Sequence, residues 1–125
     1  MAPCRILVVD DDSDIRETVS EILQDAGYAV ATAADGADAL DWLRHNPFTE
    51  QDLILLDLMM PNVNGWEFLT RKHGEAALRE IPVLLVTANA DDAAIRLDKV
   101  VGKISKPFDL HRLLDSVRSV CPAPA

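Results

Sequence analysis

The sequence has few of the residues that indicate a metal-thiolate centre, a membrane protein or a nucleic-acid-binding protein. It contains 2 cysteines and 3 histidines in 125 residues, too few and too scattered for a zinc site. No apolar run reaches the roughly 18 to 20 residues that span a bilayer, and the N-terminus has no signal-peptide pattern. Its 21 acidic residues outnumber 12 basic ones, and the net charge of −9 argues against binding to nucleic-acid phosphates. These absences predict a cytoplasmic protein with neither a nucleic-acid nor a membrane partner.

The remaining composition is that of an ordinary globular domain. Hydrophobic residues make up 49% of the chain and charged residues 26%, and the length of 125 residues is typical of one domain. We find no internal repeat, low-complexity tract or linker. We therefore expect a single domain over residues 1–125, with its core at about 4–120 and a short tail at 121–125.

The most informative stretch is the apolar run Leu53–Leu56, which ends directly in Asp57. Such a run is typical of a strand buried on both faces of a parallel sheet. Pro61 and Gly65 prevent the strand from continuing, so the chain must turn after Asp57. A carboxylate at this end of a parallel strand lies where open α/β sheets bind their ligands. The alternative is that Asp57 only caps a turn, which is a common position for aspartate.

Strand-like runs and helical periodicities alternate five times along the chain. The expected strands are residues 5–9, 29–33, 53–57, 81–87 and 103–105. Ser13 is the expected cap of the first helix, Asp91–Lys99 is an expected fourth helix, and the last helix begins near Asp109. Trp66 and Phe68 lie two residues apart on the third helix, so we do not expect both to face one core. The alternation predicts right-handed βαβ units and a doubly wound α/β fold, with one parallel sheet between helices.

Polar residues lie at the C-terminal ends of four of these strands. They are Asp10, Asp11, Asp57, Thr87 and Lys106. In a parallel sheet these ends share one edge, so we expect the side chains to meet there. Clustered carboxylates repel one another unless a cation joins them, and an all-oxygen ligand set favours Mg²⁺. A carboxylate can also attack a phosphoryl group, whose charge a metal ion, an ammonium and a hydroxyl group can stabilise together.

These motifs resemble those of response-regulator receiver domains, the phospho-accepting modules of two-component signalling. The matching residues are Val8-Val9-Asp10-Asp11, Leu56-Asp57-Leu58-Met59-Met60-Pro61 with Gly65, Val86-Thr87-Ala88 and Lys106-Pro107-Phe108. The resemblance implies a flavodoxin-like sheet of order 2-1-3-4-5 and a single-domain, chemotaxis-type architecture. It implies that a histidine kinase or histidine phosphotransfer protein phosphorylates Asp57, and that a downstream protein reads the change. Asp10, Asp11, Asp57 and the backbone carbonyl of Met59 would bind Mg²⁺, while Thr87 and Lys106 would contact the phosphoryl group. The resemblance further implies a cis Lys106-Pro107 peptide, a monomer or weak dimer, and no enzymatic activity beyond the domain's own phosphorylation and dephosphorylation.

Two departures from the family keep an alternative open, namely Lys103 and a fourth helix that we expect to be truncated or irregular. Many receivers carry an aromatic switch residue three positions before the lysine, where this chain has Lys103. The switch therefore runs through another side chain, or the chain is a phosphorylation-independent interaction module that has kept the acidic pocket. A second alternative, a haloacid-dehalogenase-type phosphatase, requires an acid two residues after the nucleophile, where Met59 stands.

The cysteines and histidines have no expected role in this chemistry. Cys4 begins the first strand and Cys121 ends the last helix, which would bring both to the N-terminal edge of the sheet. A redox link is conceivable there, but two inert thiols are the expectation in a cytoplasmic protein. His45, His73 and His111 are expected to be solvated on polar helix faces.

Overall fold

The computed structural model describes residues 4–46, 52–58, 64–87 and 99–121 of the chain. In chain order the elements are β1 (Arg5–Val9), α1 (Ser13–Asp25), β2 (Ala29–Ala33), α2 (Gly36–His45), β3 (Asp52–Leu56), α3 (Gly65–Gly74), β4 (Val83–Thr87), β5 (Val100–Ser105) and α5 (Leu110–Val120). None of the helices in these ranges has the length and apolarity that a bilayer crossing requires.

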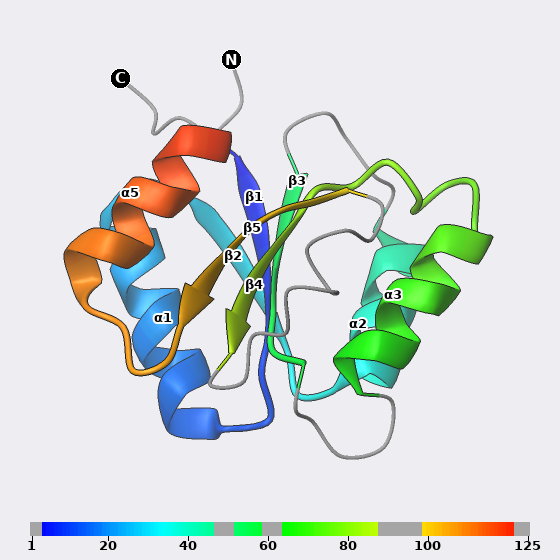
Figure 1. The fold of residues 1–125 in the computed structure, drawn as a ribbon, viewed down its shortest axis with the longest axis horizontal. Coiled ribbons are helices and arrows are strands. Elements are labelled where there is room, and N and C mark those ends of the chain that lie inside the picture. The colour runs from blue at the N-terminus through cyan, green and yellow to red at the C-terminus, as the bar shows by residue number, and fades with distance from the viewer. Residues whose placement is uncertain (1–3, 47–51, 59–63, 88–98, 122–125) are drawn as a thin grey trace.

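The five strands form one parallel sheet in the order β2-β1-β3-β4-β5. Helices α1 and α5 cover one face of the sheet, and α2 and α3 cover the other (Figure 1). The predicted doubly wound α/β fold and the strand order implied by the resemblance are both confirmed. All strands run in one direction, so their C-terminal ends lie along one edge.

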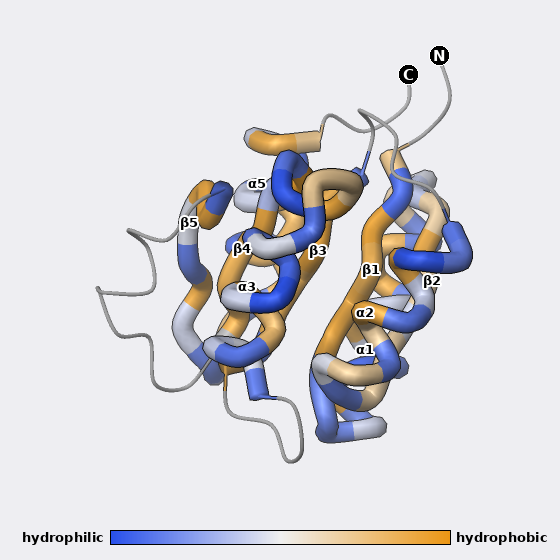
Figure 2. The backbone as a smooth tube through the Cα atoms, turned by 90° about the vertical axis from the view of Figure 1, so that its right-hand side faces the viewer, coloured by the Kyte–Doolittle hydropathy of each residue, from blue (hydrophilic) through white to orange (hydrophobic). Residues whose placement is uncertain are grey.

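Alternate residues of the central strands build two separate cores. Leu7 and Val9 of β1 join the cluster beneath α2 and α3, whereas Ile6 and Val8 join the cluster beneath α1 and α5. The strand β3 is buried along its whole length, which explains why its sequence is a continuous apolar run. Figure 2 shows this hydrophobic character along β1 and β3, between the helical layers.

Aspartate and asparagine side chains cap the helices. Asp12, and not the predicted Ser13, caps α1: its carboxylate accepts hydrogen bonds from the backbone N–H groups of Asp14 and Ile15. Ser13 instead occupies the first helical position, because Asp12 is the last residue with extended backbone. Asp109 caps α5, as the predicted start of the last helix requires.

Three strands differ from their predicted bounds, and the first, β3, runs one residue earlier than the predicted 53–57. The strand β4 begins at Val83, after Pro82, since proline has no N–H to give to the sheet. The strand β5 begins at Val100, three residues earlier than predicted, because Val100 already pairs with Val83. The predicted helix Asp91–Lys99 lies, apart from Lys99, outside the described residues.

Trp66 and Phe68 correct the expectation that they could not share a core. Phe68 is fully buried in the cluster beneath α2 and α3, and Trp66 packs against the same cluster while partly exposed. An indole ring is large enough to touch a core without being enclosed by it.

The cysteines also correct the prediction. Cys4 and Cys121 form a disulfide, and are not two separate thiols. The expected placement at one sheet edge is right, and it brings their Cα atoms to 6.0 Å, within the range that a disulfide spans. Composition and compartment favoured thiols, but this proximity could be known only from the folded chain.

Candidate functional site

Asp10 and Asp57 lie next to each other because the strands that carry them are neighbours in register. Val9 pairs with Leu56, so the residue after each strand reaches the same level of the sheet edge. The N–H of Asp57 donates to the carbonyl of Val9 at 3.0 Å, which extends the pairing past the end of β3. Asp10 is 4% exposed and Asp57 is 6% exposed. The two carboxylates therefore share a largely dehydrated position.

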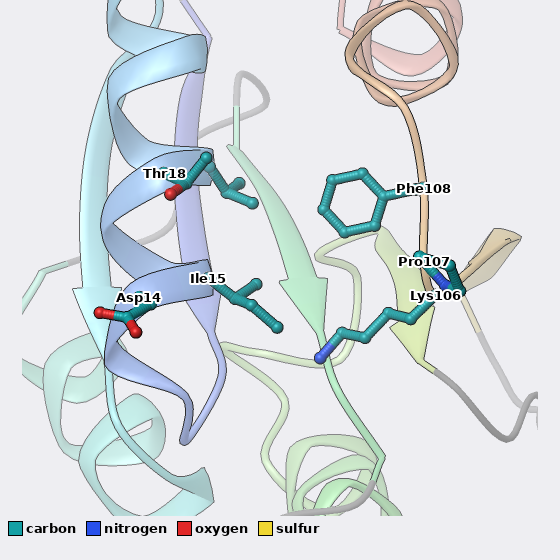
Figure 3. A pocket seen from close by; sticks show the side chains of 7 residues that line it. Asp14, Ile15, Thr18, Lys106, Pro107 and Phe108 are labelled. Carbon is teal, nitrogen blue, oxygen red and sulfur yellow. The ribbon is translucent and has the colours of Figure 1, made fainter.

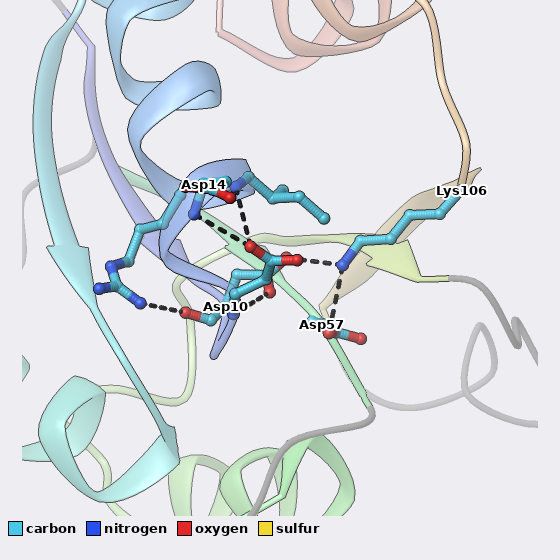
Figure 4. A network of polar contacts seen from close by, with 7 residues as sticks. Asp10, Asp14, Asp57 and Lys106 are labelled. Carbon is cyan, nitrogen blue, oxygen red and sulfur yellow. Dashed lines mark hydrogen bonds and ion pairs between the residues drawn. The ribbon is translucent and has the colours of Figure 1, made fainter.

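Lys106 reaches both carboxylates from the end of β5. Its Nζ lies 2.7 Å from Asp10 Oδ2 and 3.2 Å from Asp57 Oδ2, and its side chain keeps 15% of its surface exposed (Figure 4). Hydrogen bonds to charged groups are stronger than neutral ones, so this ammonium orients both carboxylates at once. The structure thus brings together three of the residues predicted from the strand ends.

Asp11 completes an acidic cluster with the outer side open to solvent. Carboxylate oxygens of Asp10, Asp11 and Asp57 lie within 4.8 Å of one another, with Asp10 and Asp57 buried and Asp11 exposed. Among the described residues, Lys106 neutralises only part of this charge, because one ammonium faces three carboxylates. A hard divalent cation with oxygen ligands fits both the charge and the donor set.

Two predicted participants are described in part or not at all. Thr87 is the last residue of β4, so its backbone lies at the same edge of the sheet. Met59 lies outside the described residues, as does the rest of the segment 59–63.

The electrostatics of Asp10 and Lys106 reflect burial opposed by ion pairing. Burial raises the pKa of Asp10 above its usual range, even though hydrogen bonds from Lys106 and the Asp12 N–H act in the opposite direction. Burial lowers the pKa of Lys106, but its contacts with Asp10 and Asp57 outweigh burial, so the pKa is raised overall. Lys106 is therefore a fixed positive charge at neutral pH, whereas burial disfavours the charged form of the Asp10 carboxyl group.

The loop after β1 holds Asp10 through contacts that the sequence did not reveal. The N–H of Asp12 donates to Asp10 Oδ1 at 3.0 Å, and the Arg16 guanidinium donates to the backbone carbonyl of Asp10 at 2.8 Å. Figure 4 shows these bonds around the start of α1. The Asp-Asp-Asp run could have suggested the Asp12 contact, but no sequence signal pointed to Arg16.

Gly65 packs directly against the end of β3. A Cβ at this position would lie 2.5 Å from Leu58 Cα and 2.7 Å from the carbonyl oxygen of Asp57. The Gly65 N–H also donates to the Leu58 carbonyl at 3.1 Å. Sequence reasoning treated Gly65 as a strand terminator, whereas the fold requires a residue without a side chain at this contact.

An apolar groove opens beside Lys106, between α1 and the segment that leads to α5. It has a volume of about 480 Å³ and is lined by Asp14, Ile15, Thr18, Val19, Lys106, Pro107 and Phe108. Figure 3 shows Ile15 and Phe108 facing each other across it, with the Lys106 side chain extending past its lower end. The Lys106-Pro107 peptide is cis, as the resemblance implied.

Comparison with known proteins places this geometry in a family. Residues 6–118 match the model of the response regulator receiver domain. The chain belongs to this family.

Relatives and solved structures agree with the assignment. The receiver is 33% identical to the response regulator Rre1 of Synechocystis, over 94% of this chain and 52% of the relative. It is 37% identical to the alkaline phosphatase synthesis transcriptional regulatory protein SphR of Synechococcus elongatus, over 93% of this chain and 48% of that protein. The chain thus spans about half the length of these curated relatives.

Among solved structures, the Vibrio cholerae chemotaxis protein CheY4 superposes with a TM-score of 0.85 at 34% identity, covering 95% of this chain and 99% of that one. A CheY-like receiver domain from Methanospirillum hungatei superposes with a TM-score of 0.77 at 37% identity, covering 90% and 89%. Receiver domains are in general signalling modules that are not enzymes.

Proposed function

We propose that the chain is the phospho-accepting receiver of a two-component phosphorelay, and that Asp57 is its phosphoacceptor. The observation that carries this proposal is the position of Asp57. Its side chain is buried beside Asp10 and paired with Lys106, and one of its carboxylate oxygens lies within 4.8 Å of carboxylate oxygens of Asp10 and Asp11. A turn-capping aspartate would need none of these partners.

We propose that Asp10, Asp11 and Asp57 hold Mg²⁺, together with the backbone carbonyl of Met59. The donor set fits such an ion, since it is composed of oxygen atoms and carries excess negative charge. When bound, the ion supplies positive charge to the oxygens of the transferring phosphoryl group.

The chain's own residues then have distinct roles in the transfer. A carboxylate oxygen of Asp57 attacks the phosphorus, a bond to phosphorus forms, and the bond between phosphorus and the donor's histidine nitrogen breaks with its electron pair returning to the imidazole. Lys106 Nζ, which contacts Asp57 already, remains close enough to neutralise the new acyl phosphate. The hydroxyl of Thr87, from the end of the neighbouring strand, would hydrogen-bond the same group.

The partner that supplies the phosphoryl group would be a histidine kinase or a histidine phosphotransfer protein. The apolar groove beside Lys106 offers such a protein a contact surface next to the acceptor. We expect the receiver to act in the cytoplasm as a monomer or weak dimer, through a downstream protein that reads the phosphorylated surface.

The response to phosphorylation would pass through β5 and α5, because both adjoin Lys106. Lys103 stands in β5 where many receivers have an aromatic switch residue, and it is partly buried opposite Leu85. This departure favours one second candidate, an interaction module whose binding does not depend on phosphorylation.

The decisive experiment is labelling with a small phosphodonor. Incubation with acetyl phosphate and Mg²⁺ should add one phosphoryl group to the intact protein by mass spectrometry. Asp57→Asn should remove the adduct, whereas Asp52→Asn, which changes a buried aspartate at the other end of the same strand, should retain it. An unlabelled wild type, under conditions in which a known receiver is labelled, contradicts the proposal, as does an adduct that persists in Asp57→Asn.

The role of the groove can be tested separately. Thr18→Arg should slow phosphotransfer from a phosphohistidine protein that labels the wild type, and leave labelling by acetyl phosphate unchanged. Thr70→Arg, an equally exposed threonine on α3, is the matched control. Equal transfer rates in both variants would show that the donor docks elsewhere.

A further inference from the structure

The disulfide ties the last helix to the start of β1, at the end of the sheet away from Asp57. Cys4 directly precedes β1, Cys121 directly follows α5, and the two are separated by 117 residues in sequence. Their exposed fractions are 4% and 5%. The bond therefore fixes the C-terminal end of α5 to the middle of the fold, and the proposed phosphotransfer chemistry makes no use of it.

The opposite end of α5 is linked to the phosphorylation site. The chain enters α5 from Lys106, whose ammonium contacts Asp10 and Asp57. One end of the helix is thus attached through ion pairs whose strength depends on the state of Asp57. The other end is attached through a bond whose existence depends on thiol oxidation.

The two ends of α5 also differ in how closely the surrounding residues pack. At the Lys106 end, the groove of about 480 Å³ separates the segment Lys106–Phe108 from α1. At the disulfide end, Val117 and Cys121 are buried with Cys4 in the core beneath α1 and α5. The segment that leads into α5 therefore has open space beside it at the end near the site, whereas the end of the helix near the disulfide is enclosed in the core.

Contacts that do not involve the sulfur atoms would keep the reduced protein folded. The Tyr28 hydroxyl donates to the Cys121 carbonyl at 2.6 Å, and the Cys121 N–H donates to Val117 at 2.7 Å. Leu113 and Val117 are fully buried in the same core. Reduction would remove the covalent restraint and leave these contacts, which can open and close reversibly.

We propose that Cys4 and Cys121 are a reversible redox site that limits how far α5 responds to phosphorylation of Asp57. In the oxidised protein the response stays near the Lys106 end, and in the reduced protein it extends to the C-terminal turn. The coupling to Asp57 rests on the proposed function, whereas the redox control of α5 itself does not.

The chemistry is thiol–disulfide exchange with a small disulfide such as oxidised glutathione. The thiolate of one cysteine attacks a glutathione sulfur and releases one reduced glutathione, which leaves a mixed disulfide. The second cysteine's thiolate then attacks the protein sulfur of that mixed disulfide and releases the other glutathione. Two protein thiols are oxidised, one glutathione disulfide is reduced, and both protons end on the glutathione thiols. Fraying of the last turn of α5 would expose Cys121 to the reagent.

The first test measures the redox equilibrium of the full chain. The protein is equilibrated in buffers with a series of ratios of reduced to oxidised glutathione. It is then quenched in acid, unfolded and alkylated, and its intact mass is measured by mass spectrometry. We expect a single transition between no added alkyl groups and two, with the native circular dichroism spectrum at both limits. A disulfide that is reduced only when the protein unfolds would overturn the proposal, because the bond would then have a purely structural role.

The second test follows α5 by hydrogen exchange. Without a phosphoryl analogue, amides in the last turn of α5 should exchange about tenfold faster in the reduced protein, since a local restraint is lost. The Cys4→Ala/Cys121→Ala double variant should exchange like the reduced protein in both buffers. Tyr28→Phe should retain the disulfide and show a larger increase on reduction. Identical exchange of the oxidised and reduced proteins overturns the redox site.

Beryllofluoride with Mg²⁺ separates the two proposals. We expect changes in exchange near Lys106 in both redox states, and at the C-terminal turn of α5 in the reduced state alone. An equal response of that turn in both states overturns the coupling. If beryllofluoride changed hydrogen exchange nowhere in the protein, that result would contradict the proposed function. The comparison of oxidised and reduced protein without beryllofluoride would still test the redox site.

Discussion

Oppositely charged side chains meet at both ends of the strands β1 and β3, and the two groups differ in their ratio of acidic to basic residues. At the N-terminal ends, Arg5 faces Asp52 in register and donates two hydrogen bonds, from Nε to Oδ1 at 2.8 Å and from an Nη to Oδ2 at 2.7 Å. The Arg5 guanidinium also lies 4.9 Å from the centre of the Trp42 ring. At the C-terminal ends, Asp10, Asp11 and Asp57 face Lys106.

The contrast separates a structural ion pair from a binding site. Arg5 and Asp52 match each other in charge and in geometry, so their pairing needs no further ligand. Within the part of the chain that the structure describes, three carboxylates face one ammonium in the acidic cluster, two of them buried, and a further cation would lower their mutual repulsion. Burial of carboxylates is common to both ends, and among the described residues the ends differ in the ratio of carboxylates to cations, one to one at Asp52 and three to one at the proposed site.

The largest effect on stability should come from breaking the balanced pair. Asp52→Asn removes the carboxylate charge that pairs with the Arg5 guanidinium, and we expect the free energy of unfolding to fall by about 2–3 kcal/mol. This is below the usual range for fully buried pairs, because Arg5 is 28% exposed. Urea unfolding would measure the loss. Glu67→Gln, which breaks the exposed pair with Arg71, should change stability by less than about 0.5 kcal/mol. Equal losses in the two variants would contradict the comparison.

Mg²⁺ should stabilise the functional end and have no effect through the structural one. At a concentration about 100 times the dissociation constant, the ion should raise the unfolding free energy of the wild type by about 2.7 kcal/mol. Asp10→Asn should lose most of this increment, and Asp52→Asn should keep it. Thermal unfolding with and without Mg²⁺, at matched ionic strength, measures both. A full Mg²⁺ response in Asp10→Asn would place the ion elsewhere.

A methyl group at Gly65 should disturb the functional end of β3. Because the added Cβ would overlap the backbone of Leu58 and Asp57, at 2.5 Å and 2.7 Å, we expect Gly65→Ala to destabilise the protein by about 1–3 kcal/mol. It should also slow labelling by acetyl phosphate. Gly74→Ala is the control, since nothing lies within 4 Å of a Cβ there. Comparable stability in the two variants would mean that the backbone after β3 can move to accommodate a methyl group with no loss of stability.

The smallest effect should be a pH dependence that belongs to Asp10. Its raised pKa means that the folded protein binds this proton more tightly than the unfolded chain does. Its contribution to stability is therefore greatest below the ordinary value of 3.8 and falls as pH rises through the raised pKa. In metal-free protein, Asp10→Asn should be more stable than the wild type at neutral pH, by less than about 1 kcal/mol.

The difference in stability between Asp10→Asn and the wild type should become smaller as pH falls through the raised pKa of Asp10. Urea unfolding at a series of pH values would measure it. Lys106 does not confuse the measurement, because a raised lysine pKa keeps its contribution intact below 10.5 and loses it only at higher pH. An advantage that stayed constant between neutral and acidic pH would show that Asp10 does not carry the effect.

Much of the site was predictable because parallel strands impose a simple rule. Each apolar run ended in a polar residue, and the register of β1 with β3 then placed Asp10 beside Asp57. The helix caps were less predictable, since Asp12 and Ser13 are both good capping residues and only backbone geometry chose between them. The contact of Arg16 with the Asp10 carbonyl depends on where α1 lies against β1, which no local pattern encodes.

The order and polarity of the elements, and the chemistry available at Asp57, were determined by the sequence itself. Alternating strand and helix patterns specify a parallel sheet, and a parallel sheet aligns its strand ends. Only the tertiary structure decided how the charges balance at the two ends of β1 and β3, and whether Cys4 meets Cys121. Those outcomes depend on distances between residues far apart in the chain, and packing of the two cores sets such distances.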